Sequence, residues 1–443
     1  MRAVVVFSLL VFLASGAEAD EFTPGNLLVT SWYKQLREFT REGELVQTVA
    51  IPCGVDPCPI GHQPRDVVVD AHGRAHVFNG TSAPWLSSYD PATDSWSHRT
   101  LPGWSLINNT TYGGIAMLGE LVFVPDHAIG SDPAGIIRFD LETDSALRFA
   151  EQVAGRAPIF TDLAIGPEGL LYALDGRSGG RVVVYDPFSL EQLGTLLSTP
   201  ETLRTIALDR FGMLYLGTDR EDLLVYDASG VLIERVPLIF TMSDIDVAVD
   251  GSFAVTSQFF EEILLLDADL MEIGSLALPA PSRWTFAAHV PTPLEIDIDV
   301  RPGDPTHTVR LAKHAVVPVA ILGSELLDVS RVVATSLSFG PDGAPPNPRP
   351  SPRVQDVDGD GNPDLVLLFS VSEAGIQLGD TEACLYGALL DGTRIEGCDP
   401  IQVVGACGEG FEAALVLPPV LWIARRRRHR AGSWRSDERR TRP

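Results

Sequence analysis

The stretch "DLAIGPEGLLYALDGRSGGRVVVYDPFSLEQL", residues 162–193, carries a pattern that returns through the first two thirds of the chain. An apolar strand leads through a glycine-containing turn to a second apolar strand, and a third strand ends in an aromatic or aliphatic residue followed by aspartate. A polar turn then precedes a fourth strand. That aspartate recurs at Asp90, Asp140, Asp186, Asp227 and Asp267, and residues 26–49 hold a degraded copy with Thr40 in its place.

The repeat predicts an all-β chain whose first domain, residues 24–290, is a six-bladed β-propeller. Each unit has four short strands, and 40–50 residues separate successive aspartates. Strands with alternating apolar residues cannot bury both faces alone, so the blades are expected to stack around a common axis. The alternative, an ordinary β-sandwich, gives no reason for the tyrosine–aspartate step to return at near-constant spacing.

The units "GPEGLLY", "DRFGMLY" and "VYD" resemble the NHL, gluconolactonase and streptogramin-lyase group of propellers. The resemblance implies two kinds of site, an axial divalent metal in the lactonases and a histidine and a glutamate on the top face in the lyase. Neither set can be placed on this chain residue by residue. Asp66, Asp162 and Asp244 stand at one position of the repeat, where they are either axial carboxylates or turn caps. The histidines lack metal-ligand spacing and are expected at the surface or in hairpins (His62, His72, His76, His98, His127 and His289).

A second domain, residues 294–405, follows a proline-rich joint and is expected to be β-sandwich-like. The combination of "IDVRPGD", "VPVAILGSELLDV" and "DVDGDGNPDLVLLF" resembles a small β-rich domain of secreted bacterial proteins. Its loop "DVDGDGNPD", residues 356–364, is similar in form to the calcium loops of integrin α-subunit repeats. Ca²⁺ takes six to eight oxygen ligands, and alternate aspartates in a tight turn converge on one point. The predicted ligands are Asp356, Asp358, Asp360, Asn362 and Asp364.

Position twelve of the loop is Leu367, within a predicted strand, where an EF-hand requires a bidentate glutamate. The loop is therefore predicted to hold a structural calcium ion between strands. The alternative is an acidic turn without an ion.

Both ends of the chain indicate export. Residues 1–19 read as a signal peptide cleaved after Ala19, because an arginine, an apolar run and a small-residue site follow one another. Residues 407–430 join Cys407, a short apolar run with two prolines and "RRRRHR", and they resemble the sorting tails cut by exosortase- or myxosortase-type membrane proteases. Residues 431–443 form a basic tail that is expected to stay cytoplasmic. A permanent membrane anchor and a nucleic-acid tail are the alternatives.

The cysteines and the charge agree with an exported protein. Cys53 with Cys58, and Cys384 with Cys398, are expected to form disulfides, which leaves Cys407 as a processing point. The net charge of −26 repels nucleic acid and excludes it as a partner.

The predicted function is a surface-associated binding or scaffold protein. Its propeller face is expected to bind a glycan, a small molecule or a protein, and the membrane sorting protease is its processing partner. The alternative is a metal-dependent lactonase or lyase, since propellers host both classes.

Overall fold

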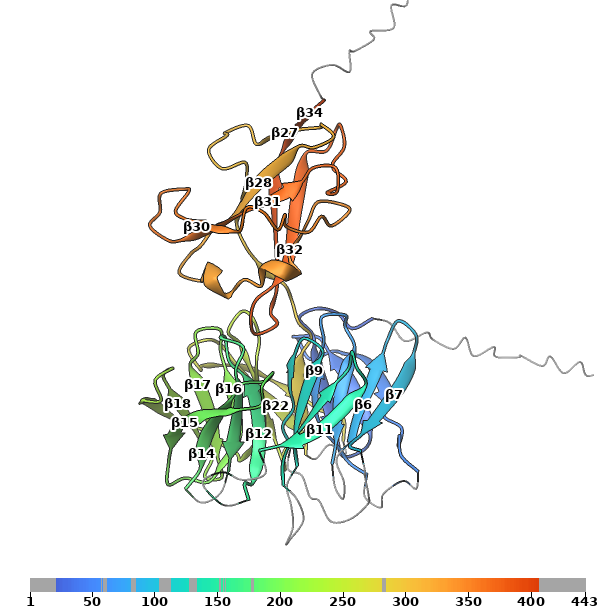
Figure 1. Cartoon of the computed structure of the whole chain (residues 1–443). Coiled ribbons are helices and arrows are strands. Elements are labelled where there is room, and N and C mark those ends of the chain that lie inside the picture. The colour runs from blue at the N-terminus through green and yellow to red at the C-terminus, as the bar shows by residue number, and fades with distance from the viewer. Residues whose placement is uncertain are drawn as a thin grey trace, which may run out of the picture.

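The computed structural model describes residues 21–405 except 57, 59–61, 81–84, 103–112, 127–133, 151–152, 154, 156, 177–178 and 281–283. The described chain forms two lobes, with the smaller one stacked on one face of the larger (Figure 1). The described residues contain strands and two 3₁₀ helices but no α-helix, so the prediction of an all-β protein is confirmed.

The larger lobe is a ring of six four-stranded antiparallel sheets, as predicted. From the axis outward, the sheets are β24 (Phe286–His289), β1 (Leu27–Ser31), β2 (Gln35–Phe39) and β3 (Leu45–Ala50) in blade 1; β4 (Pro64–Val69), β5 (Ala75–Asn79), β6 (Trp85–Asp90) and β7 (Ser95–Thr100) in blade 2; β8 (Ala116–Leu118), β9 (Leu121–Asp126), β10 (Gly135–Asp140) and β11 (Ser145–Phe149) in blade 3; β12 (Phe160–Ile165), β13 (Leu171–Asp175), β14 (Arg181–Tyr185) and β15 (Gln192–Ser198) in blade 4; β16 (Leu203–Leu208), β17 (Leu214–Thr218), β18 (Asp222–Tyr226) and β19 (Leu232–Pro237) in blade 5; and β20 (Met242–Val247), β21 (Phe253–Ser257), β22 (Glu262–Leu266) and β23 (Glu272–Ala277) in blade 6.

Blade 1 combines strands from the two ends of the propeller sequence. The degraded first copy supplies only β1, β2 and β3, and β24 completes the sheet by pairing antiparallel with β1, Leu27 opposite His289 and Thr30 opposite Phe286. The hydrogen bonds between these strands close the ring, so β1 is not left as an edge strand and β24 becomes the innermost strand of blade 1.

The repeated aspartates have a local structural role. Asp140 accepts hydrogen bonds from the backbone N–H groups of Glu142 and Thr143 in the turn between the third and fourth strands. Asp227 does the same for Ser229 and Val231 at 2.9 Å. A short carboxylate satisfies the N–H groups of a tight turn, which explains why the residue recurs in blades 2 to 6.

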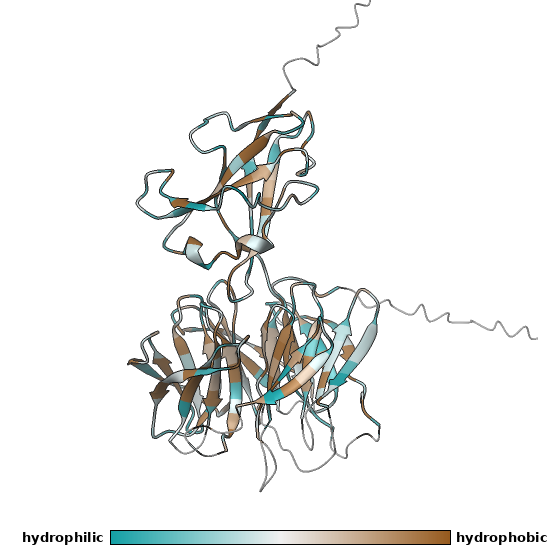
Figure 2. Cartoon of the chain, in the orientation of Figure 1, coloured by the Kyte–Doolittle hydropathy of each residue, from teal (hydrophilic) through white to brown (hydrophobic). Residues whose placement is uncertain are grey.

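Apolar side chains from neighbouring blades form the propeller core, and the brown segments of Figure 2 concentrate in the strands. Tyr215 of β17 and Phe253 of β21, for example, meet edge to face with ring centroids 4.7 Å apart. The fourth strands are largely exposed, as in β19. The apolar contacts are therefore made between the inner strands of neighbouring blades.

The smaller lobe is a β-sandwich, in agreement with the prediction. One sheet has the order β25 (Leu294–Glu295), β33 (Arg394–Pro400), β32 (Glu382–Ala388) and β29 (Ser338–Phe339). The other has the order β26 (Ile298–Val300), β28 (Val316–Ile321), β31 (Asp364–Ser370) and β30 (Arg353–Gln355). The remaining elements are a pair of short strands, β27 (Thr308–Arg310) and β34 (Gln402–Val404), and the 3₁₀ helices η1 (Val329–Arg331) and η2 (Ala334–Ser336). Phe339 and Phe369 meet in the core with ring centroids 5.1 Å apart.

Both predicted disulfides form. Cys384 and Cys398 lie opposite each other on β32 and β33, with Cα atoms 4.0 Å apart. Cys53 and Cys58 close a five-residue step in the segment between β3 and β4. The predicted processing residues Ala19 and Cys407 lie outside the described residues, as do segments 407–430 and 431–443. No helix within the described part of the chain is long and apolar enough to cross a membrane.

Candidate functional site

The innermost strands of the blades surround an axial channel with a cavity of about 180 Å³. Asp66, Asp162 and Asp244 all line it, and they come from blades 2, 4 and 6. Their exposed fractions are only 5%, 4% and 5%. The structure therefore brings these three predicted candidates together around the axis.

The three carboxylates accept hydrogen bonds from backbone N–H groups. Asp162 accepts the N–H of Leu163 on Oδ1 at 2.7 Å, and on Oδ2 it accepts the N–H of Ile206 in blade 5 at 2.8 Å. The Thr205 hydroxyl also donates to Oδ2, at 2.6 Å.

Asp244, in blade 6, repeats the arrangement of Asp162 in blade 4. Its Oδ1 accepts the N–H of Ile245 at 2.8 Å, and its Oδ2 accepts the N–H of Ala287 in β24 at 3.0 Å. Asp66 accepts the N–H of Val67 at 2.8 Å. At Asp162 and Asp244 the turn-cap interpretation is wrong, because there the carboxylates link the innermost strands of neighbouring blades.

Burial shifts the acidity of all three groups. Desolvation raises the pKa of Asp162 to about 7, against the opposing effect of its hydrogen bonds. Desolvation and then the charge of Asp244 raise the pKa of Asp66, and desolvation and then Asp162 raise the pKa of Asp244. Carboxylate ligands must lose their protons to bind a metal. In the described part of the chain, none of the four groups of potential ligand atoms within 4.8 Å of one another contains an axial aspartate.

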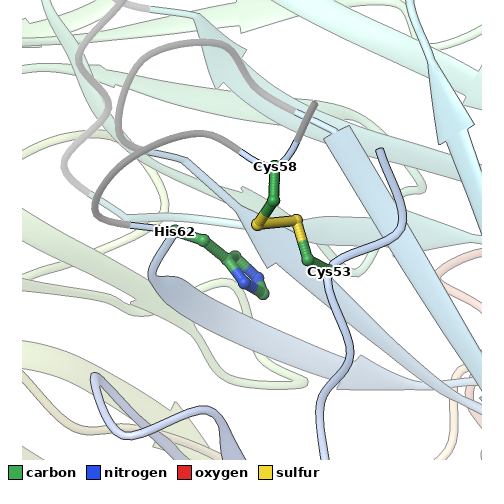
Figure 3. Close-up of side chains that lie close together, drawn as sticks. All are labelled: Cys53, Cys58 and His62. Atoms are coloured by element: carbon green, nitrogen blue, oxygen red, sulfur yellow. A yellow bond between two sulfur atoms is a disulfide. The ribbon is translucent and has the colours of Figure 1, made fainter. Parts of the chain in front are cut away.

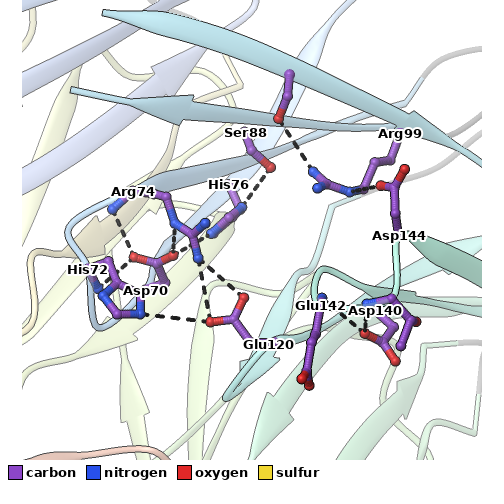
Figure 4. Close-up of polar contacts among 12 residues, drawn as sticks. Asp70, His72, Arg74, His76, Ser88, Arg99, Glu120, Asp140, Glu142 and Asp144 are labelled. Carbon is purple, nitrogen blue, oxygen red and sulfur yellow. Dashed lines mark hydrogen bonds and ion pairs between the residues drawn. The ribbon is translucent and has the colours of Figure 1, made fainter. Parts of the chain in front are cut away.

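Two of the histidines that were expected at the surface or in hairpins are buried, and of these His76 does lie in the hairpin of β4 and β5. His76 lies between Asp70, 3.1 Å from Nε2, and Ser88, 2.8 Å from Nδ1 (Figure 4). Arg74 also contacts Asp70, at 2.5 Å. Burial raises the pKa of Asp70, but the hydrogen bonds from His76 and Arg74 outweigh it and hold the pKa at about 2. This network stiffens the first turn of blade 2 because each buried polar group has a partner.

His62 corrects the expectation, because it lies neither at the surface nor in a hairpin. It is buried beside the Cys53–Cys58 disulfide (Figure 3), and Nε2 lies 2.9 Å from the side-chain oxygen of Asn79. The group formed by the two sulfurs and His62 is not a metal site, since the thiolate is the form that binds metals and both sulfurs are in the disulfide.

The acidic loop of the second domain brings three of its five predicted ligands together. The carboxylates of Asp356, Asp358 and Asp360 are exposed and lie within 4.8 Å of one another. Asp356 accepts the N–H groups of Gly359 and Gly361, at 2.7 and 3.1 Å, which curls the loop around the three acids. No ion pair among the described residues neutralises them, so the donor set fits a hard cation such as Ca²⁺.

The other two predicted ligands hold the loop in place. Asp364 is fully buried, and its two oxygens accept the N–H groups of Gly323 at 2.8 Å and Val357 at 2.7 Å. The Asn362 side chain donates to Asp360 at 2.8 Å.

The second domain holds another cluster of potential ligand side chains, which the sequence analysis did not predict. His307 Nδ1 lies 2.7 Å from Asp399, and Asp299 completes the group. The alternating acids of "EIDIDVRPGDPTH" mark one side of it, but Asp399 is 92 residues further along the chain than His307. The pairing of β27 with β34 and the hydrogen bond from the Val300 N–H to Asp399 bring the two segments together.

The second domain covers one end of the axial channel, which we call the covered mouth. Arg331 of η1 donates to the carbonyl oxygens of Pro167 at 3.0 Å and Arg210 at 2.8 Å, and it pairs with Asp391 at 2.5 Å. Arg394 donates to the carbonyl of Ala71 at 3.3 Å. These contacts attach the tip of the second domain to the turns of blades 2, 4 and 5.

An interdomain cleft of about 640 Å³ lies beside these contacts. From the propeller it is lined by the turn at Asp70 and His72 and by the joint Val290–Thr292; from the second domain it is lined by Tyr386, Ala388 and Arg394. Its volume falls within the range of small-molecule sites, and domain interfaces are a common place for them. The sequence did not indicate this cleft, because its two walls come from segments about 100 to 300 residues apart.

Comparisons with known proteins give structural matches only. No protein-family model matches the chain, and no curated protein matches it. Among solved structures, a protein of unknown function from Bacteroides caccae is 11% identical, with a TM-score of 0.45, covering 60% of this chain and 99% of that one. Virginiamycin B lyase from Staphylococcus aureus is 9% identical, with a TM-score of 0.42 and coverages of 56% and 78%. The Dos1 propeller is 13% identical, with a TM-score of 0.38 and coverages of 58% and 68%. The activity named for the lyase belongs to that protein.

Proposed function

We propose that this protein is an exported, surface-associated binding protein whose ligand occupies the interdomain cleft. The observation that carries the proposal is the cleft itself, a cavity of about 640 Å³ with walls from both domains. Tyr386 offers an aromatic surface there, and Arg394 and Asp70 offer charge and hydrogen-bonding groups. A glycan, a small molecule or a peptide has the matching mixture of apolar and polar groups.

The axial aspartates support binding over catalysis. A lactonase or lyase of the kind that the propeller resembles needs metal ligands or an acid–base pair free to face a substrate. Here the carboxylates of Asp162 and Asp244 are bonded to the main chain of two blades, and burial favours their protonated forms. Their role in the proposed function is to hold the ring together.

Export and calcium are parts of the same proposal. The proposed signal peptide and sorting tail would place the domains outside the cytoplasm, attached to the surface or released by a membrane protease. Two disulfides are compatible with an oxidising compartment. Asp356, Asp358 and Asp360, held by Asn362 and Asp364, would bind Ca²⁺ as a structural ion.

Calcium is expected to stabilise the second domain. At a hundredfold excess over its Kd, an ion that binds only the folded state adds about 2.7 kcal/mol to the free energy of unfolding. The melting temperature should therefore rise with Ca²⁺ and fall with a chelator, and Asp358→Ala should abolish the difference. Asp269→Ala, at an exposed aspartate of the propeller, is the control and should keep it. Identical melting of wild type with Ca²⁺ and with chelator contradicts the calcium site.

The binding function is tested by a thermal-shift screen of the full chain against glycans, peptides and small lactones. Tyr386→Ala is expected to weaken a cleft ligand about tenfold, because it removes the aromatic contact. Tyr33→Ala is the matched control, since Tyr33 is 46% exposed, Tyr386 is 42% exposed, and only Tyr386 lines the cleft. Metal-dependent turnover of a lactone that Asp162→Asn abolishes would replace this proposal with the enzyme.

A further inference from the structure

The second domain carries a histidine between two aspartates, in addition to the acidic loop. Asp299 lies in β26, His307 stands directly before β27, and Asp399 lies in β33. One potential ligand atom from each lies within 4.8 Å of the other two. The Asp399 side chain is 9% exposed, and those of Asp299 and His307 are 26% and 29% exposed, so the cluster is largely buried but open to solvent.

Two hydrogen-bond acceptors lie close to the Nδ1 atom of His307. The Asp399 carboxylate is 2.7 Å from Nδ1, and the carbonyl oxygen of Pro400 is 3.1 Å from it. A carbonyl oxygen and an ionised carboxylate only accept hydrogen bonds, so Nδ1 carries the ring proton and Nε2 of neutral His307 has the free lone pair. The same Asp399 oxygen accepts the N–H of Val300 at 2.6 Å, which fixes the carboxylate. Metal-binding histidines are commonly oriented in this way, by a carboxylate on the other ring nitrogen.

The Nε2 atom of His307 is separated from a carboxylate oxygen by a gap. Asp299 Oδ1 lies 4.0 Å from Nε2, and among the described residues this buried oxygen has no hydrogen-bond partner. The gap is too wide for a direct N–H···O hydrogen bond, which spans about 2.7 to 3.2 Å. A metal ion fits it better, because bonds of about 2.1 Å place two ligand atoms about 3.4 Å apart at a tetrahedral angle and about 4.2 Å apart when they lie opposite each other.

The cluster has more negative than positive charge. Within the described part of the chain, His307 is the one basic side chain that lies within 4.0 Å of Asp299 or Asp399. Arg301, two residues after Asp299, pairs with Asp304 at 3.2 Å. A buried carboxylate oxygen without a partner costs free energy, and a divalent cation would offset that cost.

We propose that Asp299 and His307 bind a first-row divalent metal ion, represented by Zn²⁺, and that Asp399 orients the imidazole. Imidazole nitrogen suits Zn²⁺ and its transition-metal neighbours, whereas Ca²⁺ takes oxygen ligands, so the cluster and the acidic loop are expected to select different ions. Water would complete the coordination, since both ligand side chains are partly exposed. The ion would link β26 to the segment before β27. The site does not depend on the cleft ligand proposed above.

The test is calorimetric titration of the full chain, without an added histidine tag, with zinc chloride in excess Ca²⁺. The excess Ca²⁺ competes with zinc for the acidic loop. One saturable zinc site per chain is expected in wild type. His307→Gln, which removes the nitrogen ligand, is expected to weaken zinc binding at least tenfold. His314→Gln, at an exposed histidine of the same domain, is the matched control and should bind zinc as wild type does.

Asp299→Asn is the second variant, because it removes the charge of the other ligand at a partly exposed position and keeps the shape of the side chain. It is also expected to weaken zinc binding at least tenfold. Near-ultraviolet circular dichroism verifies that each variant is folded. Absence of saturable zinc binding in wild type, or zinc binding by folded His307→Gln or Asp299→Asn that equals that of His314→Gln, overturns the site.

The orienting role of Asp399 has a separate readout. Co²⁺ replaces Zn²⁺ in the titration, and its visible absorption reports the ligands around the ion. Asp399→Asn is expected to weaken binding about tenfold and to change this absorption spectrum, because the imidazole loses the carboxylate that holds it. A spectrum of folded Asp399→Asn identical to that of wild type refutes this role.

Discussion

Phe286→Ala is expected to lower the free energy of unfolding by about 3 to 5 kcal/mol, the usual cost of deleting a buried phenyl group. Phe286 is 1% exposed, and it begins β24, the strand that closes the ring by pairing with β1. Phe286 lines a small hollow together with Trp284. Truncation therefore leaves a cavity at the seam that holds the first and last parts of the propeller together.

The measurement is urea denaturation of wild type and variant, followed by circular dichroism. Phe188→Ala is the matched control, because Phe188 is 68% exposed on the same propeller and should change stability by less than about 0.5 kcal/mol. Equal stability of Phe286→Ala and wild type would show that β24 contributes little to ring closure.

The axial aspartates are expected to make the propeller less stable as the pH rises from about 4 to 7. Burial raises the pKa of Asp162 to about 7, while an unfolded aspartate titrates near 3.9. Between these values the folded state binds more protons than the unfolded state, so stability falls with rising pH and levels off above the folded pKa. The largest contribution of Asp162 alone is about 4 kcal/mol, from about three pKa units at about 1.36 kcal/mol each.

Asp162→Asn removes the titrating group. Its amide keeps the acceptor for Leu163 but loses the one for Ile206 and Thr205, so the pH dependence of stability is compared and not its absolute value. The variant should show a smaller loss of melting temperature between pH 4 and pH 7 than wild type. Asp269→Asn, at an exposed position, should follow wild type. Asp70 does not affect the comparison. Because its folded pKa is about 2, the stability that it contributes is lost only as the pH falls below about 4. Parallel pH profiles of wild type and Asp162→Asn would contradict a raised pKa.

Periodic features of the propeller were predictable because they are local. The turn aspartate, as at Asp140 and Asp227, recurs in five of the six units because the same tight turn follows the third strand of each. The number of repeats of the apolar strands indicated the number of blades. The two disulfides were predictable for a similar reason, as each joins cysteines close in sequence. For the loop at residues 356–364, spacing predicted a cluster of three aspartates, and the exposed group of Asp356, Asp358 and Asp360 forms it.

Roles that depend on partners from other blades were not predictable. Asp162 and Asp244 occupy the expected position in the repeat, but their second oxygens bond to N–H groups 43 or 44 residues further along the chain. His62 and His76 have no sequence signal for burial, since the carboxylate, amide and hydroxyl that satisfy them become neighbours only when β4, β5 and β6 pair.

The all-β class, the six repeats, the two disulfides and the acidic loop were predictable without the structure, because alternation, turn chemistry and short spacings act between residues near one another in the chain. Long-range contacts were needed to show that β24 completes blade 1 and that the second domain covers one mouth of the channel through Arg331. These features join segments that lie more than 150 residues apart in the chain. Their geometry follows from closing the ring and packing one domain on the other, and no local pattern of residues encodes it.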